Sequence, residues 1–181
     1  MKLTEKTLKR TDKFVGKIIT VHTDDIELEN GQPAYREVVD HPGGVSVVAL
    51  TENDEIFLVR QFRYPYGKIL REIPAGKLER GEDPFEAVKR EQLEETGTKS
   101  ENYIWLGEVY PTPGYCGEII RLWAARVSSS GDMDLDEDEF LEVDSVPIEE
   151  ALKMVMNNEI EDSKTQIGIL KTWQLLKEGK I

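Results

Sequence analysis

The sequence predicts a layered domain of the α/β or α+β class, in which helices pack on a sheet. Short strand-like segments come first, one helix lies near the middle, and two amphipathic helices close the chain. This order is typical of α/β or α+β layered domains. A length of 181 residues with 39% hydrophobic content is enough to bury one core.

The N-terminal part is predicted to be a β extension of the main domain. Residues 1–13 are polar, and we expect them to be loosely held. Strands are expected at residues 14–21, 25–29 and 35–39, and Asn30-Gly31 is a strong hairpin turn signal between the last two. We expect an antiparallel β-hairpin extension over residues 1–42 and the main domain over residues 43–181.

The main domain is expected to alternate strands and helices. Its predicted strands are residues 45–50, 56–61, 69–73, 103–110 and 119–127, and an acidic loop is expected over residues 128–139. Apolar stripes at helical spacing predict helices at residues 148–156 and 163–177. A further helix is predicted over residues 83–96, because Asp83 is a suitable N-cap, Pro84 suits a first turn and Gly97 suits the stop.

The charge and cysteine content exclude several functional classes. A net charge of −13 and a pI near 4.7 disfavour binding to nucleic acid or anionic membranes, since both demand basic patches. Cys116 is the single cysteine, so neither an internal disulfide nor a zinc–thiolate cluster is expected. The N-terminus lacks an apolar signal core, and no apolar run is long enough to span a membrane. We therefore expect a cytoplasmic protein.

One segment carries the chemistry. Over 22 residues it places glycines, an arginine and glutamates at fixed offsets, namely Gly76, Glu82, Arg90, Glu91, Glu94, Glu95 and Gly97. At roughly 5–8% usage per residue type, a chance match at seven positions is on the order of one in 10⁸ per start site.

The glutamates of this segment predict a metal site. On a helix, Glu91 and Glu95 are four residues apart and Glu94 is three from Glu91, so the three carboxylates project on one side. Like charges at this spacing repel one another, and a divalent cation removes the conflict. Mg²⁺ takes oxygen ligands from carboxylates, water and substrate phosphate. Arg90, four residues before Glu94, is placed to hold that side chain by an ion pair.

The segment resembles the Nudix box, G-x5-E-x7-R-E-U-x-E-E-x-G-U, where U is a bulky apolar residue. Val59 to Tyr64, Glu72 to Gly76 and Thr112 to Tyr115 are similar to the ADP-ribose pyrophosphatase branch, in which a proline follows the box by about sixteen residues. Pro113 lies sixteen after Gly97. The resemblance covers roughly residues 14–176. It implies a Nudix-type α/β/α sandwich with a mixed sheet.

The resemblance also implies roles for individual residues. Metal ligands would be the Ala75 carbonyl and the carboxylates of Glu91, Glu95 and Glu139. Catalytic groups would be Glu137, Glu94 and Arg90, with Glu137 as the base. Substrate contacts would come from Arg36, Arg63, Pro113 and Glu118.

The implied reaction is Mg²⁺-dependent hydrolysis of ADP-ribose to AMP and ribose 5-phosphate. Mn²⁺ is a possible substitute, and no organic cofactor is needed. The implied assembly is a homodimer in which the N-terminal hairpin reaches the partner's active site. Two alternatives stay open: the same chemistry on another nucleoside diphosphate derivative, such as an NDP-sugar or a dinucleotide, and a non-catalytic sensor that binds ADP-ribose.

Two positions depart from the box, because Gln92 and Thr98 stand where the family prefers apolar residues. Phe85, Val88 and Gln92 lie at i, i+3 and i+7, so Gln92 continues the stripe that should face the sheet. We expect a partly buried, hydrogen-bonded Gln92. On this reasoning, Gln92→Leu would be neutral or stabilising by up to about 1 kcal/mol.

Overall fold

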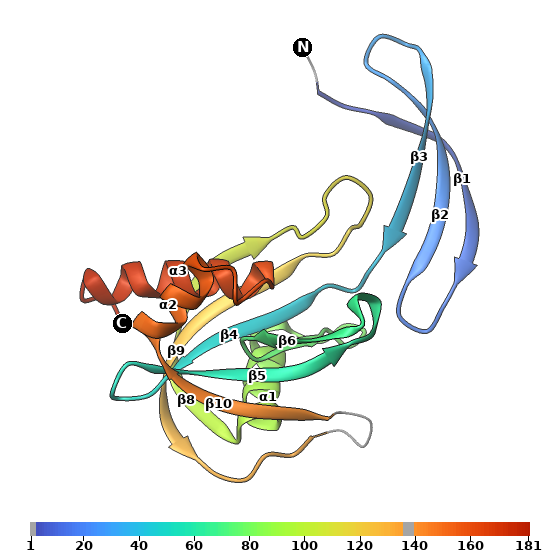
Figure 1. Ribbon diagram of the computed structural model, residues 1–181. Coiled ribbons are helices and arrows are strands. Elements are labelled where there is room, and N and C mark those ends of the chain that lie inside the picture. Colours follow the sequence, from blue (N-terminus) through green and yellow to red (C-terminus); the bar gives the residue numbers. More distant parts are fainter. Residues whose placement is uncertain (1–2, 136–139) are drawn as a thin grey trace. The chain divides into compact units, whose positions relative to one another are not determined.

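The computed structural model describes residues 3–135 and 140–181, and the chain divides into two compact units. The first unit is Met1–Gly43 together with Tyr110–Ile119, and the second is Gly44–Val109 together with Ile120–Ile181. Figure 1 shows the elements of both units. Among the described residues, no helix is both long enough and apolar enough to cross a membrane.

The first unit is built on a three-stranded antiparallel sheet. Its strands are β1 (Lys6–Val15), β2 (Thr20–Glu27) and β3 (Pro33–Asp40), in the order β1-β2-β3. The predicted turn at Asn30-Gly31 is confirmed, because Leu28 N–H donates to the Gln32 carbonyl at 2.9 Å and Gly31 has φ +80°.

Two predictions for this unit were wrong. Residues 6–13 are not loosely held but belong to β1, and residues 14–21 and 25–29 are not separate strands, because one strand, β2, runs from 20 to 27. The physical reason is that β1 is exposed almost throughout, so it shows no apolar alternation. Backbone hydrogen bonds to β2 hold β1 in place, and a sequence pattern does not reveal such pairing.

The second unit contains a seven-stranded mixed sheet in the order β10-β5-β4-β9-β8, with β6 paired to β5 and β7 paired to β4. Only the β4–β9 pair is parallel among the pairs of this sheet that the structure describes. The strands are β4 (Gly44–Leu50), β5 (Glu55–Arg63), β6 (Lys68–Glu72), β7 (Ala75–Lys77), β8 (Thr98–Val109), β9 (Ile120–Ser130) and β10 (Leu141–Pro147), and the short 3₁₀ helix η1 (Tyr64–Tyr66) joins β5 to β6.

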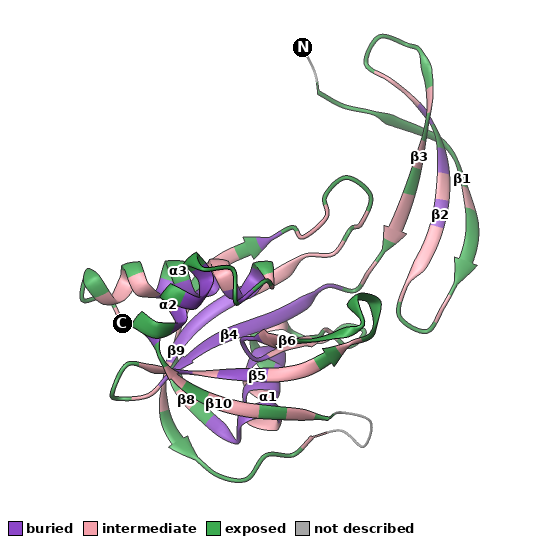
Figure 2. Cartoon of the chain, viewed as in Figure 1, coloured by how far each residue is buried: buried purple, intermediate pink, exposed green. Residues whose placement is uncertain are grey.

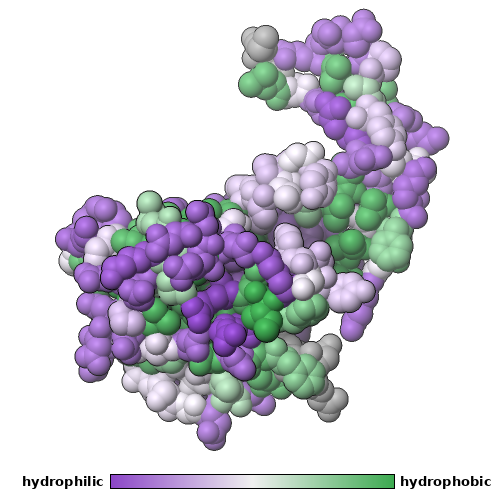
Figure 3. Space-filling model, viewed as in Figure 1, coloured by the Kyte–Doolittle hydropathy of each residue, from purple (hydrophilic) through white to green (hydrophobic). Residues whose placement is uncertain are grey.

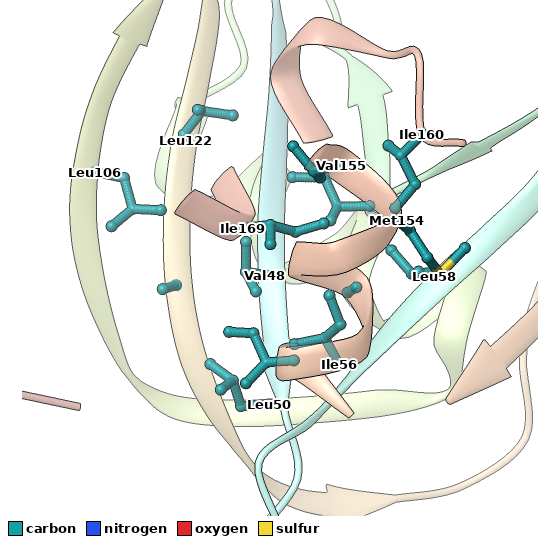
Figure 4. Close-up of a cluster of buried hydrophobic side chains, with 14 of the residues drawn as sticks. Val48, Leu50, Ile56, Leu58, Leu106, Leu122, Met154, Val155, Ile160 and Ile169 are labelled. Carbon is teal, nitrogen blue, oxygen red and sulfur yellow. The ribbon is translucent and has the colours of Figure 1, made fainter. Parts of the chain in front are cut away.

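Helices cover both faces of this sheet, as the predicted sandwich requires. They are α1 (Pro84–Thr96), α2 (Ile148–Met156) and α3 (Ser163–Lys177). Strand β4 is buried along its whole length, as Figure 2 shows. Val48 and Leu50 join the cluster that includes α2 and α3, drawn in Figure 4, whereas Val45 and Val47 join the cluster beneath α1. Alternate side chains of β4 therefore pack into two hydrophobic clusters on opposite faces of the sheet.

The main differences from the predicted elements lie in the sheet. The acidic loop was expected over residues 128–139, yet β9 continues to Ser130, and β10 was not predicted. Strand β10 pairs only with β5 among the described residues, and its side chains are mostly half-buried or exposed. An edge strand of this kind needs little apolar content, so composition did not indicate it.

Candidate active site

The residues of the box are laid out on and around α1, whose ends are fixed by its own sequence. The Asp83 carboxylate accepts hydrogen bonds from the backbone N–H of Phe85 at 2.9 Å and of Glu86 at 3.1 Å. At the other end, Gly97 has φ +65° and donates to the Leu93 carbonyl at 2.8 Å. The predicted cap and stop are therefore both confirmed.

Arg90 lies at the centre of a cluster of carboxylates. Its guanidinium donates to Glu82 at 3.0 and 3.2 Å and to Glu94 at 2.7 Å, and its Nη1 is 2.9 Å from Glu91. Burial by itself would lower the pKa of Arg90, but the hydrogen bond to Glu82 and the charges of Glu91 and Glu94 raise it overall. The same hydrogen bond lowers the pKa of Glu82. The predicted Arg90–Glu94 ion pair is confirmed.

Two box carboxylates are buried against the backbone of β7. Glu95 is 2% exposed and accepts from the Ala75 N–H at 2.8 Å, and Glu91 is 8% exposed. A Cβ placed on Gly76 would lie 1.9 Å from the Glu91 carboxylate. The box glycine therefore leaves the space that Glu91 occupies, which explains why a glycine stands at this position.

This donor set fits a hard divalent cation. Two buried carboxylates flank the Ala75–Gly76 backbone, and carboxylate oxygens are ligands that Mg²⁺ prefers. Among the described residues, however, no three His, Cys, Asp or Glu side chains form a ready metal-ligand group. Glu137 and Glu139, predicted as base and ligand, lie outside the described residues.

Arg63, predicted to contact the diphosphate, is held by a buried glutamate. Its Nε and Nη2 donate to the two oxygens of Glu72 at 2.6 and 2.7 Å. Glu72 is 1% exposed and also accepts from the ammonium group of Lys164 on α3. Burial alone would raise the pKa of Glu72, but the hydrogen bonds and charges of Arg63 and Lys164 lower it to about 2.

The charge of one box carboxylate, Glu95, also affects the pKa of Arg63. The pKa of Arg63 is raised, chiefly by its hydrogen bond to Glu72 and against the opposing effect of burial. The charges of Asp162 and Glu95 add to this rise. Glu95 is one of the two buried box carboxylates, so Arg63 lies within the electrostatic reach of the candidate metal site.

Glu72 and Lys164 were not singled out from the sequence. Glu72 begins the Glu72 to Gly76 segment that is similar to the ADP-ribose pyrophosphatase branch, but the resemblance implies no role for this residue. Lys164 is one lysine near the start of a predicted helix, where a solvated side chain is the ordinary interpretation. Its burial, 6% exposed, is visible only in the fold.

Gln92 is packed differently from the partly buried position expected for it. It is fully buried rather than partly buried, and its amide is well satisfied. Nε2 donates to Thr98 Oγ1 at 3.0 Å and to Ser100 Oγ at 2.9 Å, and Oε1 accepts from the Tyr103 hydroxyl at 2.7 Å. The two departures from the box, Gln92 and Thr98, are thus bonded to each other. The expected hydrogen bonding of Gln92 is confirmed, whereas the expectation of partial burial was wrong.

Three predicted substrate contacts belong to the first unit. Arg36 on β3 is paired with Glu5, and its Nε donates at 3.0 Å. Pro113 is exposed in the turn closed by the Cys116 N–H donating to the Thr112 carbonyl at 3.0 Å. Glu118 lies 3.6 Å from Nδ1 of His41. These three residues stay predictions as substrate contacts.

The fold and site define an α/β sandwich that carries a buried carboxylate cluster on one helix. A family model described as the NUDIX domain matches residues 40–165. The chain belongs to this family.

Curated relatives match most of the chain. A protein of Bacillus methanolicus described as methanol dehydrogenase activator is 44% identical over 167 residues, which cover 91% of this chain and 90% of the relative. A protein of Bacillus subtilis (strain 168) described as ADP-ribose pyrophosphatase is 43% identical over 169 residues, covering 92% and 91%. A solved structure described as an ADP compounds hydrolase shares the fold, with TM-score 0.81 and 19% identity over 98% of this chain and 97% of the other.

Proposed function

We propose that this protein is a Mg²⁺-dependent hydrolase that cleaves the diphosphate of ADP-ribose to AMP and ribose 5-phosphate. The observation that carries the proposal is the burial of Glu91 and Glu95 against the Ala75–Gly76 backbone. Buried carboxylates that repel one another are stable when a cation compensates their charge. The ADP-ribose pyrophosphatase relative, at 43% identity, supports the choice of substrate.

The residues of the site would have separate roles in metal binding and in catalysis. Glu91, Glu95 and the Ala75 carbonyl would hold the cation, and Glu139 would add a ligand. Bound Mg²⁺ supplies neutralisation of the diphosphate charge and lowers the pKa of a coordinated water. Arg90 keeps Glu94 and Glu82 in place through its guanidinium fork. Glu137 accepts the proton of the water that attacks phosphorus. Arg63 stabilises the negative charge on the part of the diphosphate that bridges the two phosphorus atoms.

The proposal includes a homodimer in the cytoplasm. The three-stranded sheet of the first unit exposes large apolar side chains, including Leu8, Phe14, Val15 and Tyr35, and Figure 3 shows hydrophobic surface on this unit. Exposed apolar groups gathered on one sheet are typical of an interaction surface. A second copy of the chain is the proposed partner, with the extension supplying Arg36 to the partner's site.

The deciding experiment is hydrolysis of ADP-ribose with and without Mg²⁺, with products identified by mass. AMP and ribose 5-phosphate formed only with Mg²⁺ would support the proposal. A parallel panel of NDP-sugars and dinucleotides, scored by nucleotide release, tests the alternative substrates. Binding of ADP-ribose without any product would instead indicate a sensor. Repeating the assay with Mn²⁺ tests the substitute metal.

A second candidate function comes from the 44% identity to the methanol dehydrogenase activator. We propose it as a further role of the same hydrolytic site. The test adds the protein to a methanol dehydrogenase assay, beside the Glu95→Gln variant. Faster alcohol oxidation with wild type alone would support the role, and equal rates with and without the protein would reject it.

A further inference from the structure

The segment Glu72–Gly76 is fixed at each of its first four residues, by groups from several elements. The Ile73 N–H donates to Thr165 Oγ1 at 2.9 Å, and the Pro74 carbonyl accepts from Ser46 Oγ at 2.9 Å and from the Val47 N–H at 3.0 Å. Glu72 and Ala75 are bonded as described above. This segment ends at the backbone that packs on the box carboxylates, so its placement sets the placement of the candidate site.

The start of α3 supplies one side of this arrangement. Asp162 caps the helix by accepting from the Thr165 N–H at 2.9 Å, and its carboxylate lies 3.0 Å from the Lys164 ammonium. Lys164 in turn donates to Glu72. Arg63, Lys164, Glu72 and Asp162 therefore form a network of two cations and two carboxylates that is balanced in charge.

The network decides where the Arg63 guanidinium points. Arginine has five N–H donors in a planar fork. Two of them bind Glu72, and among the described residues no further acceptor is recorded for Nη1. The Arg63 side chain is 36% exposed, whereas Glu72 and Lys164 are almost completely buried. The exposed edge of the fork is thus available to a ligand, and the buried edge is locked.

We propose that Lys164 is a positioning residue of the active site, which holds the Glu72 carboxylate so that Glu72 orients Arg63 toward the substrate's diphosphate. The proposal rests on the proposed function, in which Arg63 binds that diphosphate. Without Lys164, buried Glu72 loses a charged donor and the network has an excess negative charge. Arg63 then loses its fixed orientation, and a displaced guanidinium cannot present its fork to two phosphate oxygens.

A double-mutant cycle tests this route of action. Lys164→Met should lower kcat/KM for ADP-ribose at least about tenfold, and Lys164→Arg should recover most of the loss, since it restores a cation. In an Arg63→Ala background, Lys164→Met should have little further effect. Equal losses in both backgrounds would overturn the proposal, because a merely structural role is additive.

A matched control comes from the same helix. Lys171 on α3 is exposed, and its ammonium group donates to the Leu106 carbonyl on β8 rather than to Glu72. Lys171→Met should change stability without lowering kcat/KM. If Lys164→Met does not fold, Glu72→Gln tests the same link, because it removes the charge that holds Arg63 and keeps the side-chain shape.

A spectroscopic measurement separates this proposal from the proposed function. The Arg63 Nε–H signal in a ¹⁵N–¹H spectrum, assigned with Arg63→Lys, should be protected from solvent exchange in wild type and exchange at least about tenfold faster in Lys164→Met. This readout needs no turnover. Should wild type fail to hydrolyse ADP-ribose, the function is wrong, yet altered Arg63 exchange still supports the positioning role. Unchanged exchange overturns it.

Discussion

At the scale of single residues, the candidate site depends on close contact between carboxylates and backbone. Glu95 accepts from the Ala75 N–H, and Gly76 leaves room for Glu91. Neither contact tolerates a large change on either side.

Removal of one ligand charge should stop the chemistry and leave the fold. Glu91→Gln and Glu95→Gln each keep the side-chain shape, and the amide oxygen introduced by Glu95→Gln could still accept from the Ala75 N–H. We expect kcat to fall at least about 10²-fold, since one lost stabilising group is worth roughly 2.7 kcal/mol or more of barrier. Steady-state kinetics and circular dichroism measure the two effects. Glu86→Gln is the control, because Glu86 is exposed on the same helix. Near wild-type turnover in either ligand variant would reject the metal assignment.

A single added methyl group at Gly76 should act on the site indirectly. The new Cβ would lie 1.9 Å from the Glu91 carboxylate, which must then move. We expect Gly76→Ala to weaken Mg²⁺ binding at least about tenfold, measured by isothermal titration calorimetry, because a displaced ligand is typically worth that much in metal affinity. Gly114→Ala, where a Cβ meets nothing within 4 Å, is the control. Unchanged metal affinity in Gly76→Ala would show that Glu91 is not a ligand.

The buried amide of Gln92 gives the opposite prediction to that drawn from the sequence. Gln92→Leu leaves the Tyr103 hydroxyl and the Ser100 hydroxyl without this partner, so we expect destabilisation by about 1–3 kcal/mol. Urea unfolding followed by fluorescence measures the change. Gln92→Leu combined with Thr98→Val should recover part of the loss, because it removes two bonded polar groups together. A stable single variant would restore the original expectation.

At the scale of elements, sequence reasoning succeeded where the signal was local. Helix α1 has its cap at Asp83 and its stop at Gly97, and all three helices lie within a residue of their predicted ranges. Strands β1 and β10 were missed because their side chains are mostly exposed or half-buried, so neither strand shows an apolar pattern in the sequence. The box glutamates were predictable from spacing within 22 residues. The Glu72–Lys164 contact joins residues 92 apart and has no local signal.

The contact between strand β6 and helix α3 should make stability depend on acid pH. Glu72 has its pKa lowered from an ordinary 4.5 to about 2. Ionised Glu72 therefore contributes on the order of 3 kcal/mol to the free energy of unfolding. This contribution is complete above about pH 4.5 and is lost as the pH falls toward 2.

Urea unfolding between pH 6 and pH 2.5 measures this dependence. Wild type should lose more stability than Glu72→Gln over the interval, because the variant has no carboxyl group to titrate at this position. Parallel curves for the two proteins would show that Glu72 is not the group responsible. Glu149→Gln, an exposed residue in the first turn of α2, is the control and should follow wild type.

At the scale of the whole molecule, the chain divides its proposed substrate contacts between two compact units. Arg36, Pro113 and Glu118 belong to the first unit, and Arg63 with the box residues belongs to the second. The proposed second copy rests on the exposed apolar side chains of the first unit. The sequence could suggest this arrangement only through resemblance.

Sedimentation tests the dimer directly. We expect a species of twice 20.7 kDa at micromolar concentration, and loss of both association and activity when residues 1–42 are deleted. Phe14→Ser with Val15→Ser should weaken association while the circular dichroism spectrum is kept, because both side chains are exposed in the single chain. A fully active monomer of 20.7 kDa would remove the shared-site proposal.

The bond between Gln92 and Thr98 has a consequence for the history of the family. A lineage that exchanges the usual apolar pair for this polar pair, or the reverse, must pass through a sequence in which one member lacks its match. We expect that intermediate to be less stable than the sequences before and after it, so the two positions should change together. Related chains with glutamine at the first position should therefore carry a small hydroxyl residue at the second.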